Sequence, residues 1–289
     1  MVKTNLDLGL VEELLNKTQA EIEKMTPVNI LLVGKTGVGK STLVNNVFRE
    51  QLASTGIGKP ITKHLRRISK EGVPIVLYDT RGLELSESVQ SEVRKEIFQA
   101  LDENRKKGPD EAIHVIYYCI NANSSRIEES EISFISELSQ QVPVIIVLTQ
   151  AIGQPAETFK KYIDDLNLDV IAVRTVMAEP FVISEELTIP QKGLKELIGL
   201  TFDVIPSEVK DAFNNAQQVD IERKAKAARS WARRYVATTF GVGFTPIPFS
   251  DATILVPMQI TMMAHITAIF GISLERTSIA SILGAIGGT

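Results

Sequence analysis

The chain has 289 residues, which is enough for one large domain or two ordinary ones. Its formal net charge of −4 excludes a strongly basic composition, and we expect no DNA partner. The single cysteine, Cys119, excludes an internal disulfide and is typical of a reducing compartment, so we expect a cytoplasmic protein. Cys119 lies in an apolar run, which favours a core position over a nucleophile.

An amphipathic helix is predicted over residues 1–26, ahead of the first strand. Charged residues separate its apolar positions, so one face would pack on the rest of the protein or on a partner. The apolar positions recur at helical spacing: Leu8, Val11, Leu14, Leu15 and Ile22.

A glycine-rich loop follows the first predicted strand. Residues 28–33 form an apolar run typical of a buried strand, and residues 42–48 are predicted to be helical. Between them, Gly34 to Ser41 have the pattern G-x-x-x-x-G-K-S, which binds the phosphates of nucleoside triphosphates. Glycines let backbone amides surround phosphate oxygens, and the start of the helix adds positive potential. The sequence therefore predicts a triphosphate-binding loop.

Two residues of this loop have individual roles. Lys40 would contact the β- and γ-phosphates, and the Ser41 hydroxyl would bind Mg²⁺. The residues expected to bind the nucleotide here are contiguous: Gly34, Lys35, Thr36, Gly37, Val38, Gly39, Lys40, Ser41 and Thr42.

A second motif, D-T-R-G from Asp79 to Gly82, follows two strands predicted over 65–68 and 73–78 and joined by a hairpin-like turn. A carboxylate at the end of a strand beside a phosphate loop is suitably placed for Mg²⁺. Gly82 has no side chain, so it permits close approach of a γ-phosphate. We therefore predict that Asp79 binds the metal and that Gly82 contacts the γ-phosphate.

The remaining pattern predicts a doubly wound α/β sheet over residues 27–204, since strands alternate with helices. Ligands of such sheets bind at the C-terminal ends of the strands, where these motifs fall. The polar, glycine-rich stretch 51–63 is predicted to be a loop. Helices are predicted over 89–101, 132–138 and 159–166, with strands over 113–120, 142–148 and, as the last strand, 170–173.

On these motifs, residues 28–200 resemble the translation-factor-like class of P-loop GTPases, which includes Era-like, septin, immunity-related and plastid-import GTPases. The resemblance implies a molecular switch that binds GTP or GDP with Mg²⁺ and hydrolyses GTP. Residues 60–62 are similar to the switch I segment, so the resemblance implies that Thr62, in preference to Thr55, contacts Mg²⁺ and the γ-phosphate. Asp79 to Gly82 are similar to switch II.

The guanine-recognition motif departs from the class pattern N-K-x-D. Here Thr149 and Gln150 stand at the first two positions, and Ile152 replaces the aspartate that accepts two hydrogen bonds from guanine. We still expect Thr149 and Gln150 to contact the nucleotide, with Ala178 in the last base-contacting loop. The choice between GTP and ATP stays open.

The position after Gly82 also departs from Ras-like enzymes, in which a glutamine orients the attacking water. Leu83 stands there, and its side chain cannot hydrogen-bond water. We therefore expect slow hydrolysis unless another group or a partner completes the site. The alternative is a scaffold that binds the triphosphate and scarcely hydrolyses it.

The last part of the chain, residues 205–289, changes from basic to apolar. A helix capped by Ser207 is predicted to extend through the basic stretch 223–234. Residues 236–250 carry no charge, and residues 253–274 carry none apart from any on His265. Two alternatives follow: a membrane-associated hairpin behind a basic collar, or buried helices of a compact helical domain.

Residues 244–252 resemble an uncharacterised hydrophobic domain attached to bacterial GTPases, and we expect this domain to continue beyond residue 289. The expected partners are a guanine nucleotide, a membrane or hydrophobic partner of the C-terminal region, and a second copy through the nucleotide face. The membrane alternative places the protein peripherally or integrally at the inner membrane.

Overall fold

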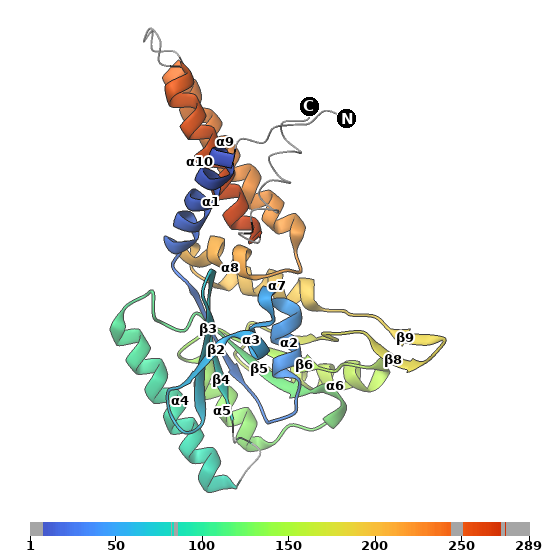
Figure 1. The fold of residues 1–289 in the computed structure, drawn as a ribbon. Coiled ribbons are helices and arrows are strands. Elements are labelled where there is room, and N and C mark those ends of the chain that lie inside the picture. Colours follow the sequence, from blue (N-terminus) through green and yellow to red (C-terminus); the bar gives the residue numbers. More distant parts are fainter. Residues whose placement is uncertain (1–7, 82, 84–85, 244–250, 273–274, 276–289) are drawn as a thin grey trace.

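A seven-stranded, mostly parallel sheet forms the centre of the protein in the computed structural model, which describes residues 8–81, 83, 86–243, 251–272 and 275 (Figure 1). The strand order is β2-β3-β4-β1-β5-β6-β7; β2 and β3 are antiparallel to their neighbours, and the other five strands run parallel. The strands are β1 (Val28–Val33), β2 (Ile57–Pro60), β3 (Leu65–Lys70), β4 (Val73–Thr80), β5 (Val115–Asn121), β6 (Val144–Thr149) and β7 (Ala172–Thr175).

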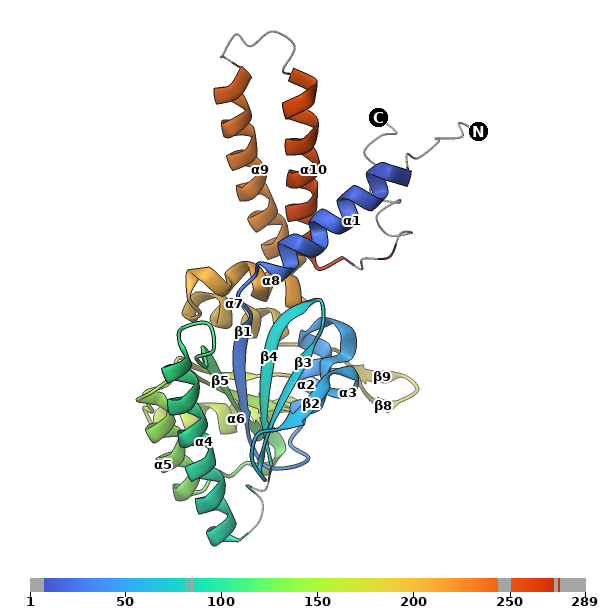
Figure 2. The same cartoon turned by 60° about the vertical axis from the view of Figure 1, so that its left-hand side comes forward.

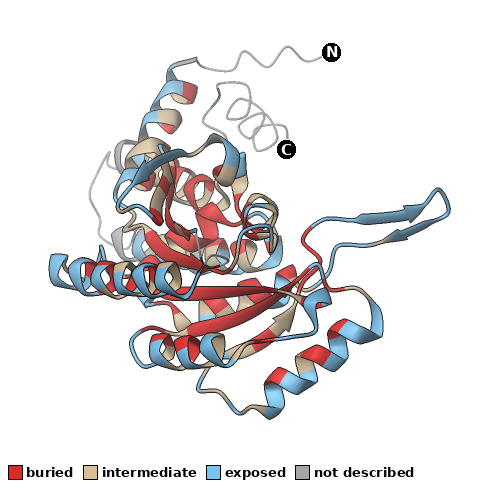
Figure 3. Ribbon diagram, turned by 90° about the horizontal axis from the view of Figure 1, so that it is seen from below, coloured by how far each residue is buried: buried red, intermediate tan, exposed pale blue. Residues whose placement is uncertain are grey.

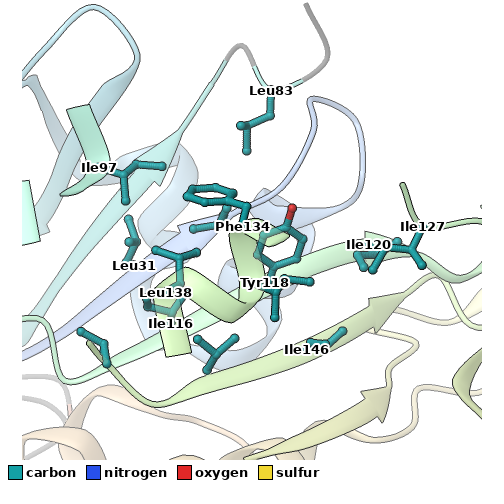
Figure 4. Close-up of a cluster of buried hydrophobic side chains, with 14 of the residues drawn as sticks. Leu31, Leu83, Ile97, Ile116, Tyr118, Ile120, Ile127, Phe134, Leu138 and Ile146 are labelled. Carbon is teal, nitrogen blue, oxygen red and sulfur yellow. The ribbon is translucent and has the colours of Figure 1, made fainter. Parts of the chain in front are cut away.

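Helices cover both faces of this sheet, because successive side chains of each strand point to opposite faces. Leu31 of β1 belongs with Phe134 to the apolar cluster on one face (Figure 4). Leu32 belongs with Leu43 to the cluster on the other face. The predicted doubly wound α/β fold is thus confirmed. The helices of this part are α2 (Lys40–Val47), α3 (Leu52–Thr55), α4 (Glu87–Lys107), α5 (Glu129–Ser139), α6 (Gly153–Asp165) and α7 (Leu194–Val204).

Three strands fall outside the predicted pattern. Strand β2 lies inside the stretch predicted to be a loop, and the prediction that the strand at 170–173 is the last one is wrong. An antiparallel hairpin of β8 (Phe181–Ser184) and β9 (Leu187–Ile189) follows and projects from the body (Figure 3). The side chains of β2 and β8 are all exposed, so these strands lack the alternation of apolar and polar residues that identifies a half-buried strand.

The single helix predicted from Ser207 is also wrong, because the chain turns at residues 217–220. A short 3-10 helix (Ser207–Val209) and α8 (Lys210–Ala216) precede the turn, and α9 (Ile221–Gly243) follows it. The Gln217 side-chain oxygen accepts hydrogen bonds from the amides of Val219 (2.8 Å) and Asp220 (2.7 Å). The Asp220 carboxylate then accepts one from the amide of Arg223 (3.0 Å), which caps the start of α9.

The first and last described helices pack together. Helix α1 (Leu8–Glu23), which confirms the predicted N-terminal helix, crosses α10 (Asp251–Phe270), and α9 lies beside α10 (Figure 2). Val11 and Leu14 of α1 pack with Ile260 and Ala264 of α10. Within the described ranges, no helix has the length and apolar character needed to cross a bilayer. Residues 244–250 and 276–289 lie outside those ranges.

We call helices α1, α8, α9 and α10 the helical layer. Arg49 joins this layer to the sheet domain. Its guanidinium donates to the carbonyl of Gly72 in the β3–β4 turn (2.5 Å) and to the side chain of Asn215 in α8 (2.6 Å). Asn215 donates in turn to the carbonyl of Ala268 in α10 (2.5 Å). The Gln218 amide donates to the carbonyl of Val47, the last residue of α2 (2.9 Å). The layer is therefore bonded to the end of the helix that begins at Lys40.

Candidate functional site

The loop between β1 and α2 has the backbone shape that its glycines permit. Gly37 and Gly39 have φ of 79° and 96°, values that residues with a side chain rarely adopt. Gly34 has φ of 149°, and a Cβ atom there would lie 2.4 Å from the carbonyl oxygen of Cys119. The strand, loop and helix thus meet at one turn, with Lys40 and Ser41 at the start of α2.

Lys40 is 8% exposed, and its ammonium group donates to the carbonyls of Gly34 (2.6 Å) and Lys35 (3.0 Å). Lys35 has a different environment, since it forms ion pairs with Glu128 (3.0 Å) and Glu131 (3.4 Å) on the α5 side. Burial lowers the pKa of Lys35, but these carboxylates outweigh it and the pKa is raised. The two lysines of the loop therefore contact different groups.

Residues of the glycine-rich loop and of the D-T-R-G motif line a common cleft of about 420 Å³, which we call the phosphate cleft. Gly34, Lys35 and Val38 do not line it; Lys35 and Val38 line a neighbouring cavity with Glu128. The lining residues of the cleft are Thr36, Gly37, Gly39, Lys40, Ser41, Thr42, Asp79, Thr80, Arg81 and Gln150.

The donor set in this cleft fits a magnesium ion. One carboxylate oxygen of Asp79 is buried without a hydrogen-bond partner, and Ser41 lines the same cleft with its side chain exposed. Burial raises the pKa of Asp79, although Lys40, Arg81 and Arg66 oppose the rise. A buried carboxylate oxygen without a donor is costly, and a hard divalent cation would satisfy it.

Thr62 does not line this cleft. Its hydroxyl donates to the Glu96 carboxylate on α4 and accepts from the amide of Leu65 (3.1 Å). The same carboxylate accepts from the amide of His64 (3.0 Å) and lies 3.3 Å from Nδ1 of His64. We call Thr62, His64 and Glu96 the switch I latch. The role of Thr62 at Mg²⁺ stays a prediction.

The structure describes only some of the other residues predicted to belong to the switch segments. Gly82, predicted to contact the γ-phosphate, lies outside the described residues, as does the side chain of Thr55. Leu83 is 7% exposed and belongs to the apolar cluster of the α4–α5 face, where Figure 4 shows it above Phe134. Leu83 is thus a core residue and offers nothing to a water molecule.

A second cavity, of about 350 Å³, adjoins the phosphate cleft, and we call it the base cavity. Gly39, Thr42 and Gln150 line both cavities. All three residues predicted for base contact, Thr149, Gln150 and Ala178, line the base cavity. Its complete lining is Gly39, Thr42, Asn123, Thr149, Gln150, Ile152, Met177, Ala178, Glu179 and Phe181.

The loop after β6 is bonded to the phosphate loop. The Thr149 hydroxyl lies within hydrogen-bond distance of the carbonyls of Val38 and Ile120, the latter at 3.1 Å. Gln150 has φ of 54°, its carbonyl accepts from the Asn123 side chain (2.9 Å), and its side chain accepts from Asn121 (3.1 Å). Thr149 therefore connects the two loops, even though the sequence lacks the asparagine of the class pattern.

Sequence reasoning missed Asn123, Glu179 and Phe181 as lining residues of the base cavity. Asn123 follows the strand predicted over 113–120, and Glu179 directly follows Ala178. These positions, just after a strand and next to a predicted base contact, were the signals in the sequence that could have identified Asn123 and Glu179. Phe181 had none, because β8 was not predicted.

Comparison with known proteins adds a family match. Residues 29–150 match the family model described as a 50S ribosome-binding GTPase. Neuronal-specific septin-3 of Danio rerio is 28% identical over 147 residues, which cover 43% of this chain and 41% of that protein. Translocase of chloroplast 159 of Arabidopsis thaliana is 31% identical over 113 residues, 38% of this chain and 8% of that protein. The chain thus spans less than half the length of these relatives.

Two solved structures were also found. One is a probable GTP-binding protein engB, with a TM-score of 0.40, 15% identity and coverage of 62% of this chain and 98% of that one. The other is the G domain of the T. maritima FeoB iron transporter, with a TM-score of 0.38, 15% identity and coverage of 61% and 98%. The sheet, the phosphate loop and the family match define the fold as that of a P-loop GTPase with additional C-terminal helices.

Proposed function

We propose that this chain is a Mg²⁺-dependent GTPase that acts as a molecular switch. One observation carries the proposal: Lys40, Ser41 and the partnerless carboxylate oxygen of Asp79 share one cleft at the C-terminal ends of β1 and β4. The match of residues 29–150 to a family of GTPases supports it. The division into an N-terminal helix (1–26), a GTPase domain (27–204) and a helical region (205–289) belongs to the same proposal.

The residues of the cleft have separate roles in this proposal. Backbone amides of the phosphate loop and the ammonium group of Lys40 bind the β- and γ-phosphates. Ser41 and Asp79 hold Mg²⁺, which when bound neutralises phosphate charge. Arg81 lines the cleft with an exposed side chain and adds positive charge there. Electrostatic stabilisation of this kind is the main contribution in phosphoryl transfer.

The switch I latch gives the proposal its two states. In the structure Thr62 is bonded to Glu96 of α4, away from the phosphate cleft. For Thr62 to reach Mg²⁺ and a γ-phosphate, its bond to Glu96 must break. A triphosphate would therefore favour an open latch, and a diphosphate, which lacks the γ-phosphate, would leave it closed.

Helix α2 is the proposed connection to the C-terminal helices. It begins at Lys40 in the phosphate cleft and ends at Val47, whose carbonyl accepts from Gln218. Arg49, just beyond, is bonded to Asn215 of α8. Movement of α2 upon nucleotide binding would thus be transmitted to the helical layer, whose partner we propose to be a membrane, a hydrophobic protein surface or a second copy.

The test is multiple-turnover phosphate release by the purified full chain with GTP or ATP, in Mg²⁺ and in excess chelator. We expect slow release from GTP that requires Mg²⁺. Release that is equal in chelator, or no affinity for either nucleotide, would overturn the proposal.

A nucleotide-binding scaffold is the second candidate function, and the burial of Leu83 favours it. Leu83 stands at the position whose glutamine orients water in Ras-like enzymes, and its side chain packs into the core, so this position provides no group to orient water. Tight GTP binding with no phosphate release, also when protein concentration is raised or lipid vesicles are added, would identify the scaffold.

A further inference from the structure

We propose that Glu179 recognises the guanine base in place of the aspartate that Ile152 replaces. This inference rests on the proposed function and concerns the base cavity alone. Guanine presents two neighbouring donors on one edge, the ring N1–H and the exocyclic amino group, and a carboxylate can accept both hydrogen bonds. Ile152 lines the base cavity but has no acceptor in its side chain.

Glu179 has the chemistry that Ile152 lacks. Of the described residues that line the base cavity, Glu179 is the one with a carboxylate. Its side chain is exposed, and it forms no ion pair or hydrogen bond with another described residue. The nearby acid Glu157, in contrast, pairs with Lys192 (3.5 Å). The Glu179 carboxylate is therefore available to a ligand.

The backbone around Glu179 is fixed against the loop that carries Ile152. The amide of Ala151 donates to the carbonyl of Val176 (3.2 Å), and the amide of Val176 donates to the carbonyl of Leu148 (2.8 Å). On the other side, the Ala178 carbonyl accepts from the Gln191 side chain (2.6 Å). Glu179 thus follows a segment that is bonded on both sides, which limits where its side chain can reach.

The other lining groups suit a purine. Asn123 and Gln150 bring side-chain amides to the base cavity, and Phe181 brings an aromatic ring, a group on which bases stack. Adenine presents an acceptor, N1, where guanine presents a donor, so a carboxylate would repel it. The geometry therefore points to discrimination between guanine and adenine that depends on Glu179, without the aspartate of the class pattern.

The test measures the affinities of the full chain for GDP, IDP, XDP and ADP with Mg²⁺. Inosine lacks the 2-amino group of guanosine, and xanthosine has a carbonyl there. We expect wild-type protein to bind GDP at least tenfold more tightly than IDP or ADP. Glu179→Gln should weaken GDP binding by tenfold or more, leave ADP binding within twofold, remove the difference between GDP and IDP, and improve XDP binding.

Glu186→Gln is the matched control, because Glu186 is an exposed acid in the β8–β9 turn and does not line the base cavity. It should leave all four affinities unchanged. Glu179→Gln that folds and keeps the wild-type ratio of GDP to ADP affinity would overturn the inference, as would wild-type protein that binds GDP and ADP equally. Absence of binding to every diphosphate would instead overturn the proposed function.

Discussion

The phosphate cleft and the base cavity adjoin each other, yet they depend on the sequence in different ways. The phosphate cleft is lined largely by one contiguous stretch, Thr36 to Thr42, which includes two glycines with positive φ and Lys40. The base cavity shares Gly39 and Thr42 with the phosphate cleft, and its other lining residues come from three separate segments, at Asn123, at Thr149 to Ile152 and at Met177 to Phe181. Side chains on separate loops can be exchanged, so a missing motif does not establish a missing site.

The largest expected effect is on the phosphate side. Lys40→Ala should weaken binding of Mg-GTP by about 100-fold or more, since hydrogen bonds to charged groups contribute about 1.5–3 kcal/mol each and two phosphates are involved. Isothermal titration would measure it. Lys35→Ala, in the same loop but paired with Glu128 and Glu131, should change the affinity little. Equal losses in both variants would refute the assignment of the two lysines.

Asp79→Asn should separate stability from metal binding. Burial raises the pKa of Asp79, so the native state binds a proton more tightly than the unfolded chain, and the ionised carboxylate destabilises the fold at neutral pH. This cost is relieved as pH falls through the raised pKa. The neutral variant should therefore melt at a higher temperature without nucleotide, while the gain in melting temperature that Mg²⁺ adds with GTP disappears.

Asp102→Asn is the control for that comparison. Asp102 is exposed and pairs with Lys106 one turn along α4, an interaction that contributes about 0.3–0.5 kcal/mol. It should leave the melting temperature and the effect of Mg²⁺ nearly unchanged. A lower melting temperature of Asp79→Asn would show that the partnerless oxygen does not destabilise the nucleotide-free fold.

Opening the switch I latch should have a smaller effect, confined to triphosphates. Glu96→Ala removes the acceptor that holds Thr62, and the lost charge-assisted bond corresponds to roughly tenfold tighter binding of a non-hydrolysable GTP analogue. GDP affinity should stay within a factor of about two, because the diphosphate does not need Thr62. Glu92→Ala, one turn earlier and paired with Lys63, is the control. Parallel changes for both nucleotides would contradict the latch.

The smallest effect on nucleotide affinity is expected from a change outside both halves of the site, in the helical layer. Lys224 is 2% exposed and donates to the Phe270 carbonyl at the end of α10 (2.7 Å). Burial, with a contribution from Arg49, lowers the pKa of Lys224 to about 8. Between pH 8 and the ordinary value of 10.5 the unfolded chain binds the proton more tightly, so stability rises with pH, by at most about 1.4 kcal/mol per pH unit.

Lys224→Met should lack this rise. Urea unfolding at pH 7, 8.5 and 10 would measure the free energy of unfolding of both proteins, and we expect the difference between them to change in favour of the wild type as pH increases. Lys226→Met, exposed on the same helix, should keep the pH dependence. Because neither change touches the nucleotide site, GDP affinity at neutral pH should match that of the wild type in both variants.

The sequence predicted the sheet and the phosphate cleft well, because buried parallel strands are continuous apolar runs and the loop pattern is contiguous. It missed β8, whose side chains are all exposed, and β9, whose side chains are exposed or only half-buried, because neither strand has a periodic signal. It also missed the turn at Gln217, where a side chain replaces backbone hydrogen bonds. Glu179 could not be predicted from spacing, because its place in the base cavity depends on how the segment after β7 is bonded to the loop after β6.

The packing of α1 on α10 sets an order of events during synthesis. Lys17 donates to the hydroxyl of Thr261, 244 residues later in the chain (3.3 Å), and Val11 and Leu14 lie against Ile260 and Ala264. On the ribosome α1 is made long before α10, so we expect Val11 and Leu14 to lack these partners until α10 has been made. The strands from β1 to β7 can assemble in the meantime, so a nascent chain would acquire the nucleotide pocket before the helical layer closes.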